Sequence, residues 1–185
     1  MLIFLKKNKI LSFLIVLIFS IISFFVIILF QNEALIKLYP SKLWGHRTNN
    51  KVLLNKAINR FSGTEFDVIF KSDLNVYDVN HPPDPSINLS LYEYFKSVKE
   101  NNTFNYWIDF KNLSNENYIN ALKRLDFITE TLEINKSNII IESTNAKLLV
   151  FFMNKGYKVS YYLPLNLSKL KGKDIVENIK IIKFH

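Results

Sequence analysis

The stretch "TEFDVIF" (residues 64–70) has the apolar composition of a buried strand but also contains two acidic side chains. Its valine, isoleucine and phenylalanine residues favour β-structure, so the stretch predicts a strand. Side chains two positions apart in a strand point to the same face, which places Glu65 and Asp67 together. Because an unpaired carboxylate is costly on a buried face, this pair requires a cation, a hydrogen-bonding partner or water.

Similar short stretches recur along the chain and alternate with helical patterns. Strands are predicted over residues 42–47, 64–70, 104–111, 138–143, 157–164 and 179–184, with 74–79 as a further strand or an extended loop. Helices are predicted where apolar residues recur at helical spacing, over residues 54–61, 91–98, 114–132 and 148–153. Ser90 and Ser114 would open two helices, and Gly156 would end the last one in a left-handed conformation. The alternation predicts an α/β fold with a parallel sheet, either a barrel or an open doubly wound sheet.

Three further stretches place polar side chains near the ends of predicted strands. "NYWIDFK" puts Asp109 and Lys111 on one strand face, "LWGHR" ends the first strand with His46 and Arg47, and "NHPPD" adds His81. Each alone has an ordinary explanation, such as a surface histidine or an internal Asp109–Lys111 ion pair. Because the carboxyl ends of neighbouring parallel strands meet at one mouth, together they predict one site.

The residue types in this predicted site suit one kind of chemistry. Glu65, Asp67 and Asp109 offer the oxygen ligands that a hard divalent cation prefers, either Mg²⁺ or Ca²⁺. The two histidines could act as general base and general acid, because imidazole titrates near neutral pH. Arg47 and Lys111 would offset the charge of a phosphate. The set therefore suits cleavage of a phosphodiester.

Other residues near the predicted mouth have supporting roles. Glu142 ends the strand "NIIIE", and we expect it at the surface or beside the metal ligands rather than bound to the ion. Trp44 and Trp107 share strand faces with the site residues and are expected to fill the barrel or to wall the pocket. Two prolines follow His81 and bias it toward an extended conformation, which would aim its imidazole.

The N-terminal segment differs from the rest of the chain. From Ile10 to Phe30 there are 21 uncharged residues, long enough to cross a bilayer of roughly 30 Å. The lysines before this run favour a cytoplasmic N-terminus, so the domain would face outward, to the periplasm or cell surface. A cleaved signal peptide and a buried soluble helix are the alternatives. The predicted parts are a basic N-terminus (1–9), a transmembrane signal anchor (10–30), a linker (31–41) and the α/β domain (42–185).

Composition excludes some classes of site. The chain has no cysteine, so disulfides, thiolate metal sites and a cysteine nucleophile are excluded. The formal net charge is +8, but the lysines are scattered and form no basic stripe with interleaved aromatic residues. We therefore expect no nucleic-acid partner.

The motifs together resemble the glycerophosphodiester phosphodiesterase superfamily, which is related in fold to the phosphatidylinositol phospholipases C. They are more closely similar to its menorin-like branch. The resemblance covers roughly residues 42–165. It is carried by the His-x-x-Asn opening at 46–49, "HPP" at 81–83, "L-x-L-x-E-Y" near 89–94 and "DFK" at 109–111.

This resemblance implies a TIM-barrel fold and a metal-dependent phosphodiesterase, which the apolar N-terminal segment would anchor to the membrane. It implies His46 and His81 as the acid–base pair and a phosphodiester-containing small molecule or lipid head group as substrate. Asp109 stands where the phosphodiesterases usually carry glutamate, as it does in the menorin-like branch. Some menorin-like proteins are adhesion or patterning factors, so the alternative is a non-catalytic surface module that binds a glycan, lipid or protein.

The expected barrel is short at its C-terminus. A complete barrel has eight strands and about 250 residues, whereas the sequence offers six or seven strand candidates in residues 42–185. Either the sequence is a fragment of a longer barrel, or irregular segments or another chain close the sheet, so an oligomer is one of the expected arrangements.

Overall fold

The computed structural model describes residues 9–39, 41–98, 103–162 and 172. The chain divides into two units, Met1–Pro40 and Ser41–His185. The predicted strand at 179–184 lies outside the described residues.

In the first unit the described residues form a single long helix, α2 (Lys9–Leu38). Its residues 11–38 form the one helix in the described part of the chain that is long and apolar enough to cross a membrane, judged by length and composition. The helix continues through residues 31–38, which the sequence analysis assigned to a linker. This segment contains good helix formers and meets its first proline at position 40, so nothing in it ends the helix earlier.

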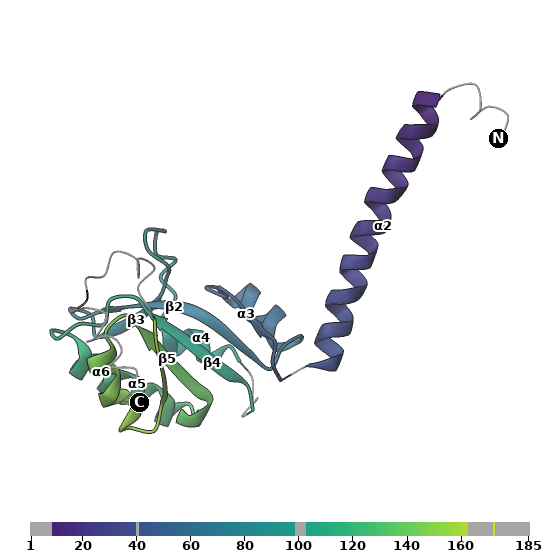
Figure 1. Ribbon diagram of the computed structural model, residues 1–185. Coiled ribbons are helices and arrows are strands. Elements are labelled where there is room, and N and C mark those ends of the chain that lie inside the picture. The colour runs from purple at the N-terminus through teal and green to yellow at the C-terminus, as the bar shows by residue number, and fades with distance from the viewer. Residues whose placement is uncertain (1–8, 40, 99–102, 163–171, 173–185) are drawn as a thin grey trace. The chain divides into compact units, whose positions relative to one another are not determined.

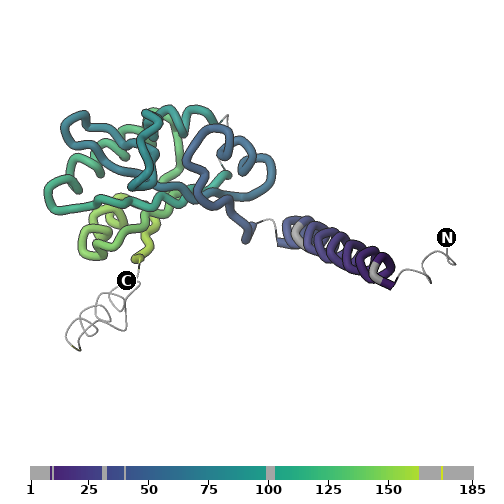
Figure 2. Tube along the Cα trace, turned by 90° about the horizontal axis from the view of Figure 1, so that it is seen from above, coloured from purple at the N-terminus to yellow at the C-terminus, as the bar shows by residue number. Residues whose placement is uncertain are grey.

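The described residues of the second unit form a six-stranded sheet whose strands are mostly parallel. Along the sheet the order is β1-β2-β4-β5-β6, and β3 pairs with β2. Helix α6 (Ala146–Met153) packs beside β5 and β6, and α5 (Tyr118–Thr131) lies beside α6, as Figure 1 shows; Figure 2 traces the same chain from above. The strands are β1 (Trp44–Gly45), β2 (Gly63–Lys71), β3 (Val76–Val79), β4 (Asn105–Phe110), β5 (Ile139–Ser143) and β6 (Lys158–Tyr161).

Strand β3 departs from the parallel pattern that the alternation predicted. It runs antiparallel to β2, with Val79 opposite Val68 and Val76 opposite Lys71. A short turn at residues 72–75 joins the two strands, which a parallel crossover could not do in so few residues. Of the two alternatives left open for residues 74–79, the strand is therefore correct.

Strands β1 and β3 share one edge of β2 in succession. β1 pairs with Gly63 and Thr64 at the start of β2, and β3 pairs with residues 68–71 at its end. Strand β4 pairs with the opposite edge along residues 63–68. The stretch of β2 at residues 65–67 therefore has no strand partner on the first edge among the described residues.

The two faces of the sheet differ in chemistry. One face, with Phe66, Val68, Ile108 and Ile141, is buried against the helices and forms the hydrophobic core. Alternate residues of the same strands, which include Glu65, Asp109 and Glu142, point to the other face. The helices thus supply the stability, and the opposite face is left for polar groups.

The helices overlap the predicted ranges. They are α3 (Lys51–Ile58), α4 (Leu91–Lys96), α5 (Tyr118–Thr131) and α6 (Ala146–Met153), with a 3-10 turn η1 (Lys136–Asn138) before β5. Helix α3 begins and ends three residues earlier than predicted. Ser90 caps α4 as predicted, because its hydroxyl accepts from the Glu93 N–H. Helix α5 begins later than predicted, because Ser114 pairs with Asn117 in a turn. Ile119, which belongs to the apolar stripe that predicted a helix over residues 114–132, is 51% exposed at the start of α5.

Candidate metal and phosphate site

The site lies on the polar face of the sheet, where three carboxylates occupy one row across adjacent strands. Asp67 of β2 is in register with Asp109 of β4, and Asp109 is in register with Glu142 of β5. Ser160 of β6 continues the row beside Glu142. Glu65 lies two positions earlier in β2, on the same face. The parallel register therefore brings together acidic residues that are far apart in the sequence.

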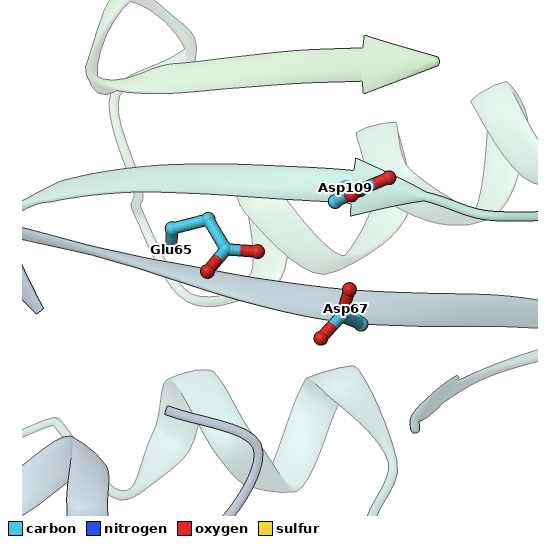
Figure 3. A group of neighbouring side chains, drawn as sticks. All are labelled: Glu65, Asp67 and Asp109. Carbon is cyan, nitrogen blue, oxygen red and sulfur yellow. The ribbon is translucent and has the colours of Figure 1, made fainter. Parts of the chain in front are cut away.

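Glu65, Asp67 and Asp109 can offer one oxygen each to a single cation. These oxygens lie within 4.8 Å of one another, and Figure 3 shows the three side chains extending toward a common space from β2 and β4. Three carboxylates with no nitrogen or sulfur donor among them match the ligand preference of Mg²⁺ or Ca²⁺. The donor set predicted from the sequence therefore fits a divalent cation.

Asp67 is the most buried of the three carboxylates, with its side chain 2% exposed. Asn49 holds it in two directions: Asn49 Nδ2 donates to Asp67 Oδ2 at 2.7 Å, and the Asp67 backbone N–H donates to Asn49 Oδ1 at 2.8 Å. Lys111 Nζ contacts Asp67 Oδ1 at 2.8 Å and Asp109 Oδ2 at 2.5 Å. The predicted internal pair of Asp109 and Lys111 is thus a three-membered group that includes Asp67.

The loop after β1 donates hydrogen bonds to both the side chain and the backbone of Glu65. The Arg47 N–H donates to Glu65 Oε2 at 2.7 Å, and the Thr48 N–H donates to the Glu65 carbonyl at 3.0 Å. Arg47 adopts a left-handed backbone conformation, with φ of 53°, which turns the chain at this point. Beneath the loop, the Tyr94 hydroxyl donates to the Thr48 carbonyl at 2.9 Å. This network fixes the direction of the Glu65 carboxylate.

The two predicted acid–base histidines differ in their surroundings. His46 Nε2 lies 3.6 Å from Glu65 Oε2, and its side chain is 76% exposed. His81 is partly buried, and its Nε2 lies 3.4 Å from Arg47 Nη2. Arg47 therefore links the two histidine-bearing segments, by its backbone to Glu65 and by its side chain to His81.

A cavity of about 500 Å³ opens over these groups. Trp44 and Trp107 form part of its wall, with ring centroids 6.1 Å apart in an edge-to-face arrangement. This agrees with the pocket-wall role considered from the sequence. The cavity is lined by Lys42, Trp44, Gly45, His46, Arg47, Glu65, Asp67, Trp107, Asp109, Lys111, Glu142 and Tyr162. His81 is absent from this set of described lining residues.

Burial raises the pKa of Glu65, and the negative charges of Asp67 and Asp109 raise it further, while the Arg47 N–H and His46 oppose the rise. Burial also raises the pKa of Glu142, against a hydrogen bond of 2.8 Å from the Ser160 hydroxyl. For Lys111, burial acts to lower the pKa, but the hydrogen bonds to Asp109 and Asp67 outweigh it and the pKa is raised. The site thus concentrates negative charge that a cation would relieve.

Sequence reasoning missed the residues that hold the ligands in place. Asn49, Thr48 and Tyr94 make the hydrogen bonds described above, yet none was assigned a role. Asn49 belongs to the quoted His-x-x-Asn opening, so its signal was present in the sequence. Tyr94 likewise ends the quoted "L-x-L-x-E-Y" motif, whereas Thr48 carried no such signal. The contact between Thr48 and Tyr94 joins two segments 46 residues apart, so neither motif predicted it.

Comparison with known proteins identifies the fold. No family model matches the chain, and no curated protein matches it either. A glycerophosphodiester phosphodiesterase structure from Parabacteroides distasonis ATCC 8503 is 19% identical, with a TM-score of 0.55 over 79% of this chain and 76% of that one. A structure assigned to the same activity from Galdieria sulphuraria is 16% identical, with a TM-score of 0.54 over 76% of this chain and 72% of that one.

A third similar structure is assigned as a glycerophosphoryl diester phosphodiesterase, from Silicibacter pomeroyi DSS-3. It is 11% identical, with a TM-score of 0.53 over 71% of this chain and 68% of that one. These likenesses show that the chain has the fold of the glycerophosphodiester phosphodiesterases, a TIM-barrel-like α/β fold. The predicted fold class is therefore confirmed, whereas the menorin-like branch stays a prediction.

Proposed function

We propose that this chain is a membrane-anchored, metal-dependent phosphodiesterase that acts outside the cytoplasm on a glycerophosphodiester or a related lipid head group. The observation that carries the proposal is the meeting of three carboxylates, within 4.8 Å of one another, with Arg47, Lys111 and His46 around one cavity. Cation ligands, phosphate-binding cations and an imidazole are the groups that phosphodiester cleavage requires. The fold of the neighbours supports the same reaction class.

Each residue would have a defined part in the reaction. Glu65, Asp67 and Asp109 would hold the divalent cation, which when bound stabilises negative charge on the phosphate oxygens. Arg47 and Lys111 would contact the phosphate. One imidazole takes the proton from the attacking hydroxyl as the new P–O bond forms, and the other protonates the leaving oxygen as the old P–O bond breaks.

In this scheme His46 would be the general base, because of its contact with Glu65. The Glu65 carboxylate lies 3.6 Å from His46 Nε2, so it can stabilise the imidazolium that forms when His46 takes a proton. His81 would then be the acid. Its Nε2 lies 3.4 Å from Arg47 Nη2, and this contact would break when the guanidinium turns to bind a phosphate oxygen.

The membrane part of the proposal rests on α2. An apolar helix of this length, preceded by lysines, would place residues 41–185 outside the cytoplasm. Protease added to intact cells should cleave the domain only if it is exposed at the surface, or after the outer layer is opened if it is periplasmic. Protection under both conditions would contradict this orientation.

The reaction can be tested on the full chain in detergent micelles. Glycerophosphodiesters should be hydrolysed in the presence of Mg²⁺, Ca²⁺ or Mn²⁺, and a chelator should abolish the activity. His81→Ala and Asp109→Asn should each lower kcat by at least about a hundredfold. Lys136→Met, which removes a lysine that pairs with Asp126 outside the cavity, serves as the matched surface control. Absence of hydrolysis with all three metals would refute the proposal.

A non-catalytic surface module is the second candidate, and the position of His81 favours it. His81 lies outside the set of described residues that line the cavity, so only one of the two predicted imidazoles faces it. Such a module would bind a phosphate-bearing ligand and leave it intact. Binding of glycerophosphodiesters by calorimetry, without turnover in any metal, would support this candidate.

A further inference from the structure

The ammonium group of Lys111 occupies the space between two of the three candidate metal ligands. Its Nζ lies 2.8 Å from Asp67 Oδ1 and 2.5 Å from Asp109 Oδ2. The Lys111 side chain is 28% exposed, against 2% for Asp67 and 15% for Asp109. A single amine thus neutralises charge on two neighbouring parallel strands.

The other oxygen of Asp67 is already engaged. Asp67 Oδ2 accepts from Asn49 Nδ2 at 2.7 Å, and the return bond from the Asp67 N–H to Asn49 closes a two-way pair. A cation would therefore bind Asp67 through Oδ1, and this is the oxygen that Lys111 contacts. Asp109 Oδ2 is covered by the same amine, so movement of one side chain would free oxygens on both carboxylates.

We propose that Lys111 is a displaceable counter-ion, which holds Asp67 and Asp109 together in the metal-free protein and is expelled onto the substrate phosphate when a divalent cation binds. This inference rests on two parts of the proposed function, the cation site and the contact of Lys111 with phosphate, and does not require hydrolysis. An ammonium and a divalent cation compete for the same oxygen lone pairs, and their like charges repel at such distances. One of them must therefore leave.

The structure offers the amine room to move. Lys111 lines the main cavity of about 500 Å³ and also a smaller neighbouring cavity of about 160 Å³, which Thr144 and Tyr162 border. Its long flexible side chain can swing without a change in the backbone. Cation and phosphate binding then become coupled, because each favours the outward position of Lys111, and the coupling is reciprocal.

Calorimetry of Mg²⁺ binding to the full chain tests the displacement. Lys111→Met should raise the affinity for Mg²⁺ by about tenfold, because the cation no longer has to expel an ammonium. The same variant should reduce the factor by which Mg²⁺ strengthens the binding of inorganic phosphate. Lys136→Met is the matched control, since Lys136 also pairs with two carboxylates, Asp126 and Glu130, away from the cavity. Its Mg²⁺ affinity should equal that of the wild type.

A second measurement uses the wild-type protein, so it stands even if Lys111→Met folds poorly. An amine-specific acylating reagent, followed by mass spectrometry, should modify Lys111 several-fold faster with Mg²⁺ than without it. Lys136 should react at the same rate in both conditions. Added inorganic phosphate should slow the reaction of Lys111 again in the presence of Mg²⁺.

The inference is overturned if Lys111→Met binds Mg²⁺ no more tightly than the wild type, or if Mg²⁺ leaves the labelling of Lys111 unchanged. Failure of the proposed function would look different. Mg²⁺-dependent labelling without hydrolysis of any phosphodiester would retain the counter-ion role and reject the phosphodiesterase. Hydrolysis of a phosphodiester, with labelling of Lys111 that Mg²⁺ does not increase, would retain the phosphodiesterase and reject the counter-ion role.

Discussion

Asn49 and Asp67 are joined by two hydrogen bonds that run in opposite directions, of 2.7 Å to the carboxylate and 2.8 Å from the backbone N–H. A neutral amide thereby fixes both the position of a buried acid and the strand that carries it. Partners of this kind orient ligands without touching the ion.

Replacement of Asn49 by alanine should lower the affinity for Mg²⁺ by about tenfold, because Asp67 loses the group that orients it. The free energy of unfolding should also fall by about 1–3 kcal/mol, since a buried carboxylate oxygen loses its donor. Calorimetry and chemical denaturation measure the two effects. Asn59→Ala is the control, because the Asn59 side chain donates to the Asn55 carbonyl on the surface, away from the site. Equal effects from both variants would contradict the role of Asn49.

Binding of Mg²⁺ should weaken as the pH falls, and the decline should begin at a higher pH than an ordinary glutamate would give. Burial raises the pKa of Glu65, and a protonated Glu65 offers no charged oxygen to the ion. Calorimetry in buffers of different ionisation enthalpy should detect proton release on binding at mildly acidic pH. The proton release should shrink in Glu65→Gln, and an unchanged value would assign it to another group.

The same raised pKa sets the sign of a stability effect in the metal-free protein. Because the folded state holds the Glu65 proton more tightly than the unfolded chain, this contribution is fully present below the ordinary glutamate pKa. It is lost as the pH rises through the raised value. Glu65→Gln should therefore flatten the decline in the free energy of unfolding across that interval. A profile that is unchanged by the substitution would contradict the assignment.

Tyr94→Phe should destabilise the domain by about 1–2 kcal/mol, because the Thr48 carbonyl and hydroxyl lose a buried partner. The ring itself would keep its contact with Phe66, whose centroid is 4.4 Å away. Tyr92→Phe, on the same helix but partly exposed, should change little. Chemical denaturation compares them. Equal stability of the two variants would mean that the hydroxyl of Tyr94 contributes nothing.

Gly63→Ala should destabilise the domain by about 1–3 kcal/mol through steric overlap. A Cβ at this position would lie 2.7 Å from Trp44 Cδ2 and 2.9 Å from the Asn105 carbonyl oxygen. The substitution should cost less in a Trp44→Leu background, because one of the two overlaps is removed. A double-mutant cycle measured by chemical denaturation gives the difference. An equal cost in both backgrounds would show that the indole does not set the requirement for glycine.

The sequence predicted the parallel strands well because their alternating burial is a local property. β2 and β4 alternate between the core and the polar face in the way that "TEFDVIF" and "NYWIDFK" indicate. Periodicity alone could not predict the antiparallel β3, since the direction of a strand depends on its connection and pairing partner. The late start of α5 has a similar cause, because the turn at Ser114 depends on the side chain of Asn117.

The carboxylates of the site could be predicted for the same reason, because acids on a strand face conflict with burial. The hydrogen-bonding and ionic partners of these carboxylates could not be predicted. The link from Lys111 to Asp67 joins two strands, and its existence depends on a parallel register that pairs Asp67 with Asp109. The contact of His81 with Arg47 likewise depends on the paths of two loops.

The interval in β2 between its pairing with β1 and with β3 has a consequence for how the site moves. In place of a strand, the Thr48 N–H donates to the Glu65 carbonyl, and the Asn80 N–H donates to the Asp67 carbonyl at 3.0 Å. The segments that carry His46 and His81 are thus hydrogen-bonded to the same stretch of β2, residues 65–67. A shift of that strand would therefore move both β2 carboxylates together with the backbones of the two segments that carry the histidines.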